Sequence, residues 1–122
     1  MDIEKREIFR AIAKMAYAIA KADRGLSAEE RRAFNEIVKK ELDYESWAAQ
    51  SRFELLDEVT QPTIEKAYSE AMHEFRKYKS HVTEDIKEKA IIVMKRVADA
   101  CSGFSEQEAL LLDRFKKDIQ QL

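Results

Sequence analysis

The sequence predicts an all-α fold, a compact bundle of about six or seven helices. Composition is the first reason: 45% of the 122 residues are hydrophobic and 38% are charged, which is too apolar for a disordered chain. The chain also has only two glycines and one proline, too few for the turns of a many-stranded sheet. The second reason is that apolar residues recur at helical spacing. A chain of this length can bury one core, so a single domain over residues 1–122 is expected.

The first two helices have the clearest patterns. Apolar residues at steps of four, three and four predict an amphipathic helix over about residues 3–22. These residues are Ile8, Ile12, Met15 and Ile19, and the stripe is widened by Phe9, Ala13, Ala16 and Ala20. A second helix is expected to begin after Ser27 and to end near residue 41. Its inward residues are Phe34, Ile37, Val38 and, at its end, Leu42.

The middle of the chain has a weaker pattern. Over residues 43–60 the apolar positions fit one or two short helical pieces better than one long helix. Pro62 is then expected in the first turn of the next helix, where its missing N–H would have had no partner anyway. This helix continues to about residue 79, and its inward residues are Ile64, Ala67, Tyr68, Ala71, Met72 and Phe75.

Two further helices complete the predicted bundle. Thr83 is followed by two acidic residues, so it is expected to cap a helix whose positive N-terminal end favours those charges. The buried stripe of this helix is Ile86, Ala90, Val93, Val97 and Cys101, with Ile91, Ile92 and Met94 beside it. Because it is the most apolar helix, it is expected to be the central one. The last helix follows Ser105 and turns Leu111, Leu112, Phe115 and Ile119 inward.

The segments AKADRGLSAEE, residues 20–30, and ADACSGFSEQE, residues 98–108, repeat one pattern. When Gly25 is aligned with Gly103, the identical pairs are Ala20/Ala98, Ala22/Ala100, Gly25/Gly103, Ser27/Ser105 and Glu30/Glu108. A helix, a tight turn and a second helix therefore occur twice. The bundle is expected to contain two pseudo-repeated helical hairpins, with residues 43–80 between them.

The repeated residues are those that end one helix and begin the next. Glycine ends the first helix of each copy, because it adopts the left-handed conformation that lets the chain turn back. Ser27 and Ser105 are predicted N-caps, and Glu30 and Glu108, three residues later, complete S-x-x-E capping boxes.

A metal site is the functional alternative for the same turns. Acidic residues of the two copies would have to converge around a divalent cation, which needs roughly six to eight oxygens if it is Ca²⁺. The candidate ligands are Asp23, Glu29, Glu30, Asp99, Glu106 and Glu108. The turn is not an EF-hand, because Ala20 and Arg31 stand where the ligating acids belong, and Arg24 opposes a cation. Capping is therefore the favoured interpretation, and no cofactor is expected, with a divalent cation as the alternative.

The repeated pattern resembles the TerB-like domains of tellurite-resistance proteins. The resemblance is carried by Asp23, Leu26, Ser27 and Glu30 in the first copy and by Phe104, Ser105 and Glu108 in the second. This sequence departs from the family pattern where Arg24 and Ser102 replace glycine and Cys101 replaces the second acid. The resemblance implies a cytoplasmic accessory protein of a bacterial tellurite-resistance or stress-response system. Such a protein would have no catalytic activity and would bind protein partners, and it could bind metal.

The charge pattern argues against a nucleic-acid partner. The net charge is −2, and the 22 Lys and Arg residues are dispersed among 24 Asp and Glu residues, so no basic face is expected. No apolar run approaches the roughly 20 residues that span a bilayer, so no membrane insertion is expected. The single cysteine cannot form an intrachain disulfide, and the charged N-terminus does not resemble a secretion signal. These features favour a cytoplasmic protein, whose partner and oligomeric state the sequence does not identify.

Catalytic patterns are weak throughout. Glu70 and His73 form one E-x-x-H pair, whereas di-iron bundles use this motif twice. Cys101 has no histidine tied to it by spacing, so it is not expected to be a nucleophile. The chain is therefore expected not to be an enzyme. Trp47, in the weakly patterned middle, is the best candidate for an anchor that a protein partner recognises.

Overall fold

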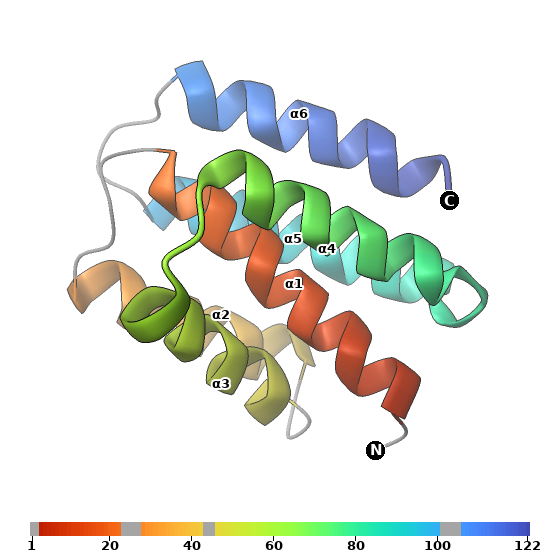
Figure 1. The fold of residues 1–122 in the computed structure, drawn as a ribbon, viewed down its shortest axis with the longest axis horizontal. Coiled ribbons are helices and arrows are strands. Elements are labelled where there is room, and N and C mark those ends of the chain that lie inside the picture. Colours follow the sequence, from red (N-terminus) through yellow and green to blue (C-terminus); the bar gives the residue numbers. More distant parts are fainter. Residues whose placement is uncertain (1–2, 23–27, 43–45, 101–105) are drawn as a thin grey trace.

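The computed structural model describes residues 3–22, 28–42, 46–100 and 106–122, and Figure 1 shows these residues as a bundle of helices. The described residues form six α-helices and no strand, which confirms the all-α prediction. The α-helices are α1 (Ile3–Lys21), α2 (Ala28–Leu42), α3 (Trp47–Leu55), α4 (Ile64–Lys77), α5 (Glu84–Ala100) and α6 (Glu106–Gln120). Two shorter elements are the π-helix η2 (Leu56–Thr60) and the 3₁₀-helix η3 (Lys79–His81).

Helix α1 lies at the centre of the bundle, with α3 on one side of it and α4 on the other (Figure 1). It also contacts α5 and, less extensively, α6. The prediction that the helix after Thr83 is central is therefore wrong. Alanines explain the difference, because Ala11, Ala13, Ala16 and Ala18 are fully buried and let neighbouring helices approach α1 closely from several directions. In α5, by contrast, Ile91 and Ile92 are only partly buried.

The two repeated units are interleaved in the bundle. Helix α2 packs mainly against α5, and α1 contacts α6, so each unit places its second helix against the first helix of the other unit. Helices α1 and α5 also contact each other, and α5 packs against α6. The first unit does not form the closely packed hairpin that its short turn suggests, since α2 packs mainly against α5 rather than α1.

The predicted turns between the repeated helices lie outside the described residues, and with them Gly25, Ser27, Gly103 and Ser105. The helices around them agree with the predicted positions. Helix α2 begins at Ala28 and α6 begins at Glu106, one residue after each predicted cap serine. The two helix starts are thus confirmed, and the capping bonds of the serines stay predictions.

One or two short helical pieces were expected over residues 43–60, and the structure has two, α3 and η2, which follow each other without a break. Gln61 ends η2 in the left-handed conformation, with φ 43° and ψ 56°, and its N–H donates to the Leu56 carbonyl at 2.7 Å. Pro62 then precedes the N-cap of α4, so it lies outside the first turn in which it was expected. Its carbonyl accepts a hydrogen bond from Lys21 Nζ at 2.9 Å, which joins this connection to the end of α1.

Threonine side chains cap α4 and α5. Thr63 Oγ1 accepts the Lys66 N–H and Thr83 Oγ1 accepts the Ile86 N–H, each at 3.2 Å. The Thr83 cap was predicted, whereas the Thr63 cap was missed because Pro62 was assigned to the helix.

Replacing Thr83 by alanine should lower the free energy of unfolding by about 1 kcal/mol, because one N–H in the first turn of α5 loses its acceptor. Urea denaturation followed by circular dichroism measures the change. Ser69→Ala is the matched control, since Ser69 is exposed in the interior of α4, where alanine is the better helix former. Equal stability of the two variants would show that Thr83 does not act as a cap.

Candidate functional site

A groove on the surface lies between α2 on one side and α3 with η2 on the other, and we call it the α2–α3 groove. Its volume is about 310 Å³. The lining residues are Arg31 and Asn35 from α2, Trp47, Gln50, Ser51, Phe53 and Glu54 from α3, and Glu58 from η2. The groove therefore joins an aromatic surface to charged and amide side chains, a combination suited to binding a ligand rather than to catalysis.

Two aromatic residues of α3 have different roles in this groove. Trp47, the first residue of α3, keeps 50% of its surface exposed. Phe53 is buried, and its ring stacks on Phe34 of α2 with centroids 3.9 Å apart and planes 16° apart. Tyr17 of α1 meets the Phe53 ring edge-on, with a centroid distance of 6.2 Å. The groove thus has a buried, stacked aromatic ring at its base and a half-exposed indole at its edge.

The polar side of the groove is acidic. Glu54 and Glu58 are four residues apart, and both are exposed. Neither carboxylate has a hydrogen bond or ion pair with another residue in the described part of the chain. Asn35 and Gln50 are half-buried, and the Gln50 amide is held in place because its Nε2 donates to Ser46 Oγ at 2.8 Å.

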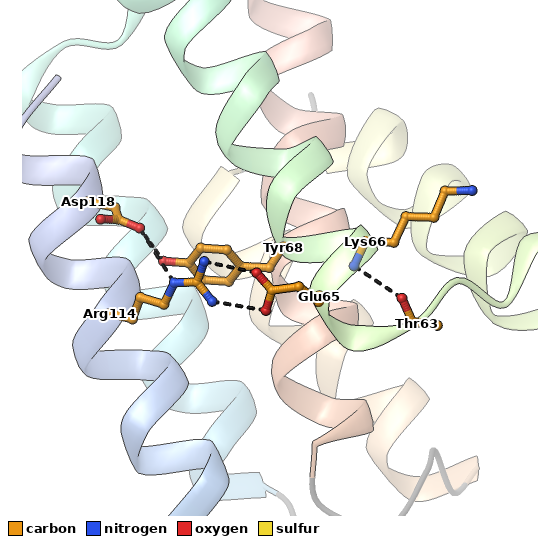
Figure 2. A network of polar contacts seen from close by, with 6 residues as sticks. All are labelled: Thr63, Glu65, Lys66, Tyr68, Arg114 and Asp118. Atoms are coloured by element: carbon orange, nitrogen blue, oxygen red, sulfur yellow. Dashed lines mark hydrogen bonds and ion pairs between the residues drawn. The ribbon is translucent and has the colours of Figure 1, made fainter.

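A second polar cluster joins α4 to α6, and its residues point toward one another (Figure 2). Arg114 of α6 donates two hydrogen bonds to the Glu65 carboxylate of α4, at 3.1 and 3.0 Å. The Tyr68 hydroxyl donates to Asp118 Oδ2 at 2.6 Å. The Arg114 guanidinium also lies over the Tyr68 ring, with Cζ 3.9 Å from the ring centroid. The Arg114 guanidinium, the Tyr68 ring and the two carboxylates therefore interact with one another across the two helices.

The protonation of this cluster suits a structural role. Burial, and then the hydrogen bond to Asp118, raise the pKa of Tyr68 above its ordinary value, so the phenol stays neutral and cannot act as a base near neutral pH. The hydrogen bond from Arg114 lowers the pKa of Glu65, which keeps this carboxylate charged. The same bond raises the pKa of Arg114. The cluster therefore joins α6 to α4 through groups that engage one another.

The predicted metal ligands differ in burial, and some lie outside the described residues. Asp23 lies outside the described residues, and Glu29 and Glu30 belong to the first turn of α2, but their side chains are likewise outside that part. Asp99 near the end of α5 and Glu106 at the start of α6 are exposed, and Glu108 is fully buried. No group of three histidine, cysteine or acidic residues that could hold a metal occurs among the described residues.

The two histidines and Glu70 were the residues considered for catalysis that lie within the described part of the chain. Glu70 Oε2 lies 3.6 Å from Lys14 Nζ of α1, so an intramolecular cation engages this carboxylate, while His73 is exposed. His81 in η3 is exposed beside Ser80. Cys101 lies outside the described residues. Of the helices that the structure describes, none has the length and apolar character needed to cross a membrane.

The sequence points to Trp47 as a partner anchor and to Tyr68 as an inward residue, but it does not point to the charged residues of the groove or of the Arg114 cluster. Glu65 and Tyr68 lie three apart and Arg114 and Asp118 four apart, so each pair shares one helix face. Glu54 and Glu58 are likewise four residues apart. The sequence does not show that α4 packs beside α6 or that α2 lies beside α3. Only these helix contacts bring the first two pairs together in one cluster and place Glu54 and Glu58 in a groove.

Comparison with known proteins identifies a family. A family model described as "Tellurite resistance protein TerB" matches residues 9–120. No curated protein and no solved structure matches the chain. The matched range covers all of α2 through α6 and most of α1, so it includes both repeated units, the α2–α3 groove and the Arg114 cluster.

Proposed function

Because this chain belongs to the TerB family of tellurite resistance proteins, we propose that it is a non-catalytic interaction domain that acts through protein partners. The system in which it acts would be a bacterial tellurite-resistance or stress-response system, and its place of action would be the cytoplasm. The observation that carries the proposal is the family match over residues 9–120. Fold alone would not carry it, since one helical bundle supports many functions.

The chemistry of the described side chains supports binding rather than catalysis. The charged residues of the Arg114 cluster engage one another, and Glu70 is engaged by Lys14. The α2–α3 groove, by contrast, presents a half-exposed indole beside two carboxylates without described partners. Exposed aromatic residues of this kind are frequent at the centre of protein interfaces.

Growth on tellurite tests the proposal. Deleting the gene should lower the tellurite concentration that the source bacterium tolerates, and expression of the intact chain should restore the tolerance. A tagged chain purified after chemical crosslinking should retain the same proteins in repeated preparations from tellurite-exposed cells. A deletion strain that tolerates tellurite and other stresses as well as its parent would contradict the proposed system.

Divalent-metal binding by the two acidic turns is the competing function. We expect calorimetric titration with Ca²⁺, Mg²⁺ and Zn²⁺ at millimolar concentration to give no saturable heat, because Cys101 replaces an acid in the second turn and Arg24 adds a positive charge to the first. The matched control is the Asp99→Asn/Glu106→Asn variant, which removes the two exposed candidate ligands. Saturable heat with the natural chain that this variant loses would establish metal binding instead.

A further inference from the structure

We infer that the α2–α3 groove binds a short segment of a protein partner that carries an apolar side chain next to a lysine or arginine. Trp47 would be the apolar anchor, and Glu54 and Glu58 would receive the positive charge. The inference rests on the proposed function, because it assumes that the chain acts by binding protein. It adds the surface used and the chemistry of the segment that is bound.

Trp47 supplies the apolar surface of the groove. Its indole is 50% exposed at the first turn of α3, beside a groove whose base is the buried Phe53 ring. Stacking on Phe34 and the edge contact with Tyr17 hold that ring, so Phe53 cannot rotate outward to fill the groove. An apolar side chain entering the groove would therefore remove water from Trp47 without first displacing a core residue. Tryptophan is among the residues that contribute most when an interface covers them.

The charge of the groove selects the neighbouring side chain. Glu54 and Glu58 give the groove two negative charges, and Arg31 on the opposite wall gives it one positive charge. Some other exposed carboxylates, such as Glu65 and Asp85, have intramolecular cations at 3.0 and 3.2 Å. Glu54 and Glu58 have no such partner in the described residues. A lysine or arginine from outside would supply the missing complement, and an acidic segment would be repelled.

The size of the groove limits what can enter. A volume of about 310 Å³ lies at the lower end of the range for ligand pockets, roughly 300–1,000 Å³, and suits one or two side chains. Asn35 and Gln50 lie on opposite walls and offer amide groups to the backbone of a bound segment. The hydrogen bond to Ser46 fixes the Gln50 amide beforehand, which lowers the entropy cost of binding. These features favour a short peptide segment over a folded surface.

The test begins with the intact chain and a random-peptide display library. Selected peptides should carry an apolar residue adjacent to lysine or arginine. Trp47 is the sole tryptophan of the chain. A synthetic copy of a selected peptide that lacks tryptophan can therefore be titrated into the protein while the fluorescence of Trp47 is measured. Binding should shift the Trp47 emission to shorter wavelength, because the indole leaves water. Raising the salt concentration should weaken the binding, as expected for exposed charge pairs.

Variants locate the contact on the groove. Trp47→Ala should weaken the binding of a fluorescently labelled peptide by about 30-fold, the loss typical of an interface hot spot. The double variant Glu54→Gln/Glu58→Gln should weaken it by about 10-fold through the loss of two charge pairs. The matched control is Glu88→Gln/Asp113→Asn, which removes the same charge from exposed positions on α5 and α6 and should bind as the natural chain does. Unchanged circular dichroism would show that each variant is folded.

Several results would overturn the inference. In the display experiment, these results are the enrichment of no peptides or the enrichment of acidic peptides. In the variant experiment, the result is equal binding by the Glu54→Gln/Glu58→Gln variant and its control. A further such result is self-association of the chain that depends on concentration and that Trp47→Ala abolishes. The last result would assign the groove to a second copy of this chain. A Trp47→Ala chain that restores tellurite tolerance and retains its crosslinked proteins would reject the groove but leave the proposed function standing. A deletion strain that tolerates tellurite and other stresses as well as its parent would reject the proposed function itself.

Discussion

Replacing Phe34 by alanine should lower the free energy of unfolding by about 3–5 kcal/mol. The Phe34 side chain is fully buried and stacks on Phe53 at 3.9 Å, so truncation removes the stacking contact and leaves a cavity between α2 and α3. Domains of this size are typically stable by about 5–15 kcal/mol, so the variant should be close to unfolding at moderate temperature. Urea denaturation measures the loss as a lower midpoint.

Two controls make the Phe34 experiment specific. Phe34→Leu retains most of the volume and should cost less than about 1.5 kcal/mol. Leu110→Ala removes a side chain that is 63% exposed and should change stability by less than about 0.5 kcal/mol. If Phe34→Ala lowered the free energy of unfolding no more than Leu110→Ala does, the stacked pair would not hold α2 against α3. The assignment of Phe53 as a fixed base of the α2–α3 groove would then be wrong.

Replacing Tyr68 by phenylalanine should lower the free energy of unfolding by about 1–2 kcal/mol at neutral pH. The ring and its contact with Arg114 remain, whereas Asp118 loses a hydrogen bond of 2.6 Å. Asp118 is 28% exposed, so water replaces part of the lost interaction and the effect stays near the lower end for a bond to a charged group. The matched control is Tyr78→Phe, which removes a hydroxyl outside this cluster.

The Tyr68 contribution should also depend on pH in a defined direction. The pKa of Tyr68 is raised in the folded protein, so above the ordinary tyrosine pKa of about 10 the unfolded chain loses this proton while the folded chain keeps it. The stabilisation is therefore complete below about pH 10 and falls as the pH rises further. Denaturation of the natural chain and of Tyr68→Phe across this range measures it. A stability difference that stayed constant above pH 10 would contradict the raised pKa.

The helices could be predicted because their signals are local. Periodic apolar residues placed α1 and α4–α6, Thr83 marked the start of α5, and the repeated motif placed the starts of α2 and α6 one residue after Ser27 and Ser105. The local signal was ambiguous at Pro62, which was expected inside α4 although Thr63 is the cap. Proline suits both positions, and only the Thr63 hydrogen bond to the Lys66 N–H distinguishes them.

The candidate site was only partly predictable. The exposed indole of Trp47 could be expected from its place in a weakly patterned segment, but the carboxylates beside it could not. Glu54 and Glu58 resemble many other exposed acids in the sequence until α2 and η2 are positioned around them. The predicted metal ligands stay predictions as a set, since Asp23 and the side chains of Glu29 and Glu30 lie outside the described residues.

By itself the sequence determined the helical class, most of the helix limits, the internal repeat and the TerB family. It could do so because helix formation depends on hydrogen bonds four residues apart and on caps within one turn. Only the tertiary structure decided that α1 is central, that α2 packs against α5, and that Arg114 and Glu65 join α6 to α4. These contacts depend on how whole helix faces fit one another across long stretches of chain, and local spacing carries no record of that fit.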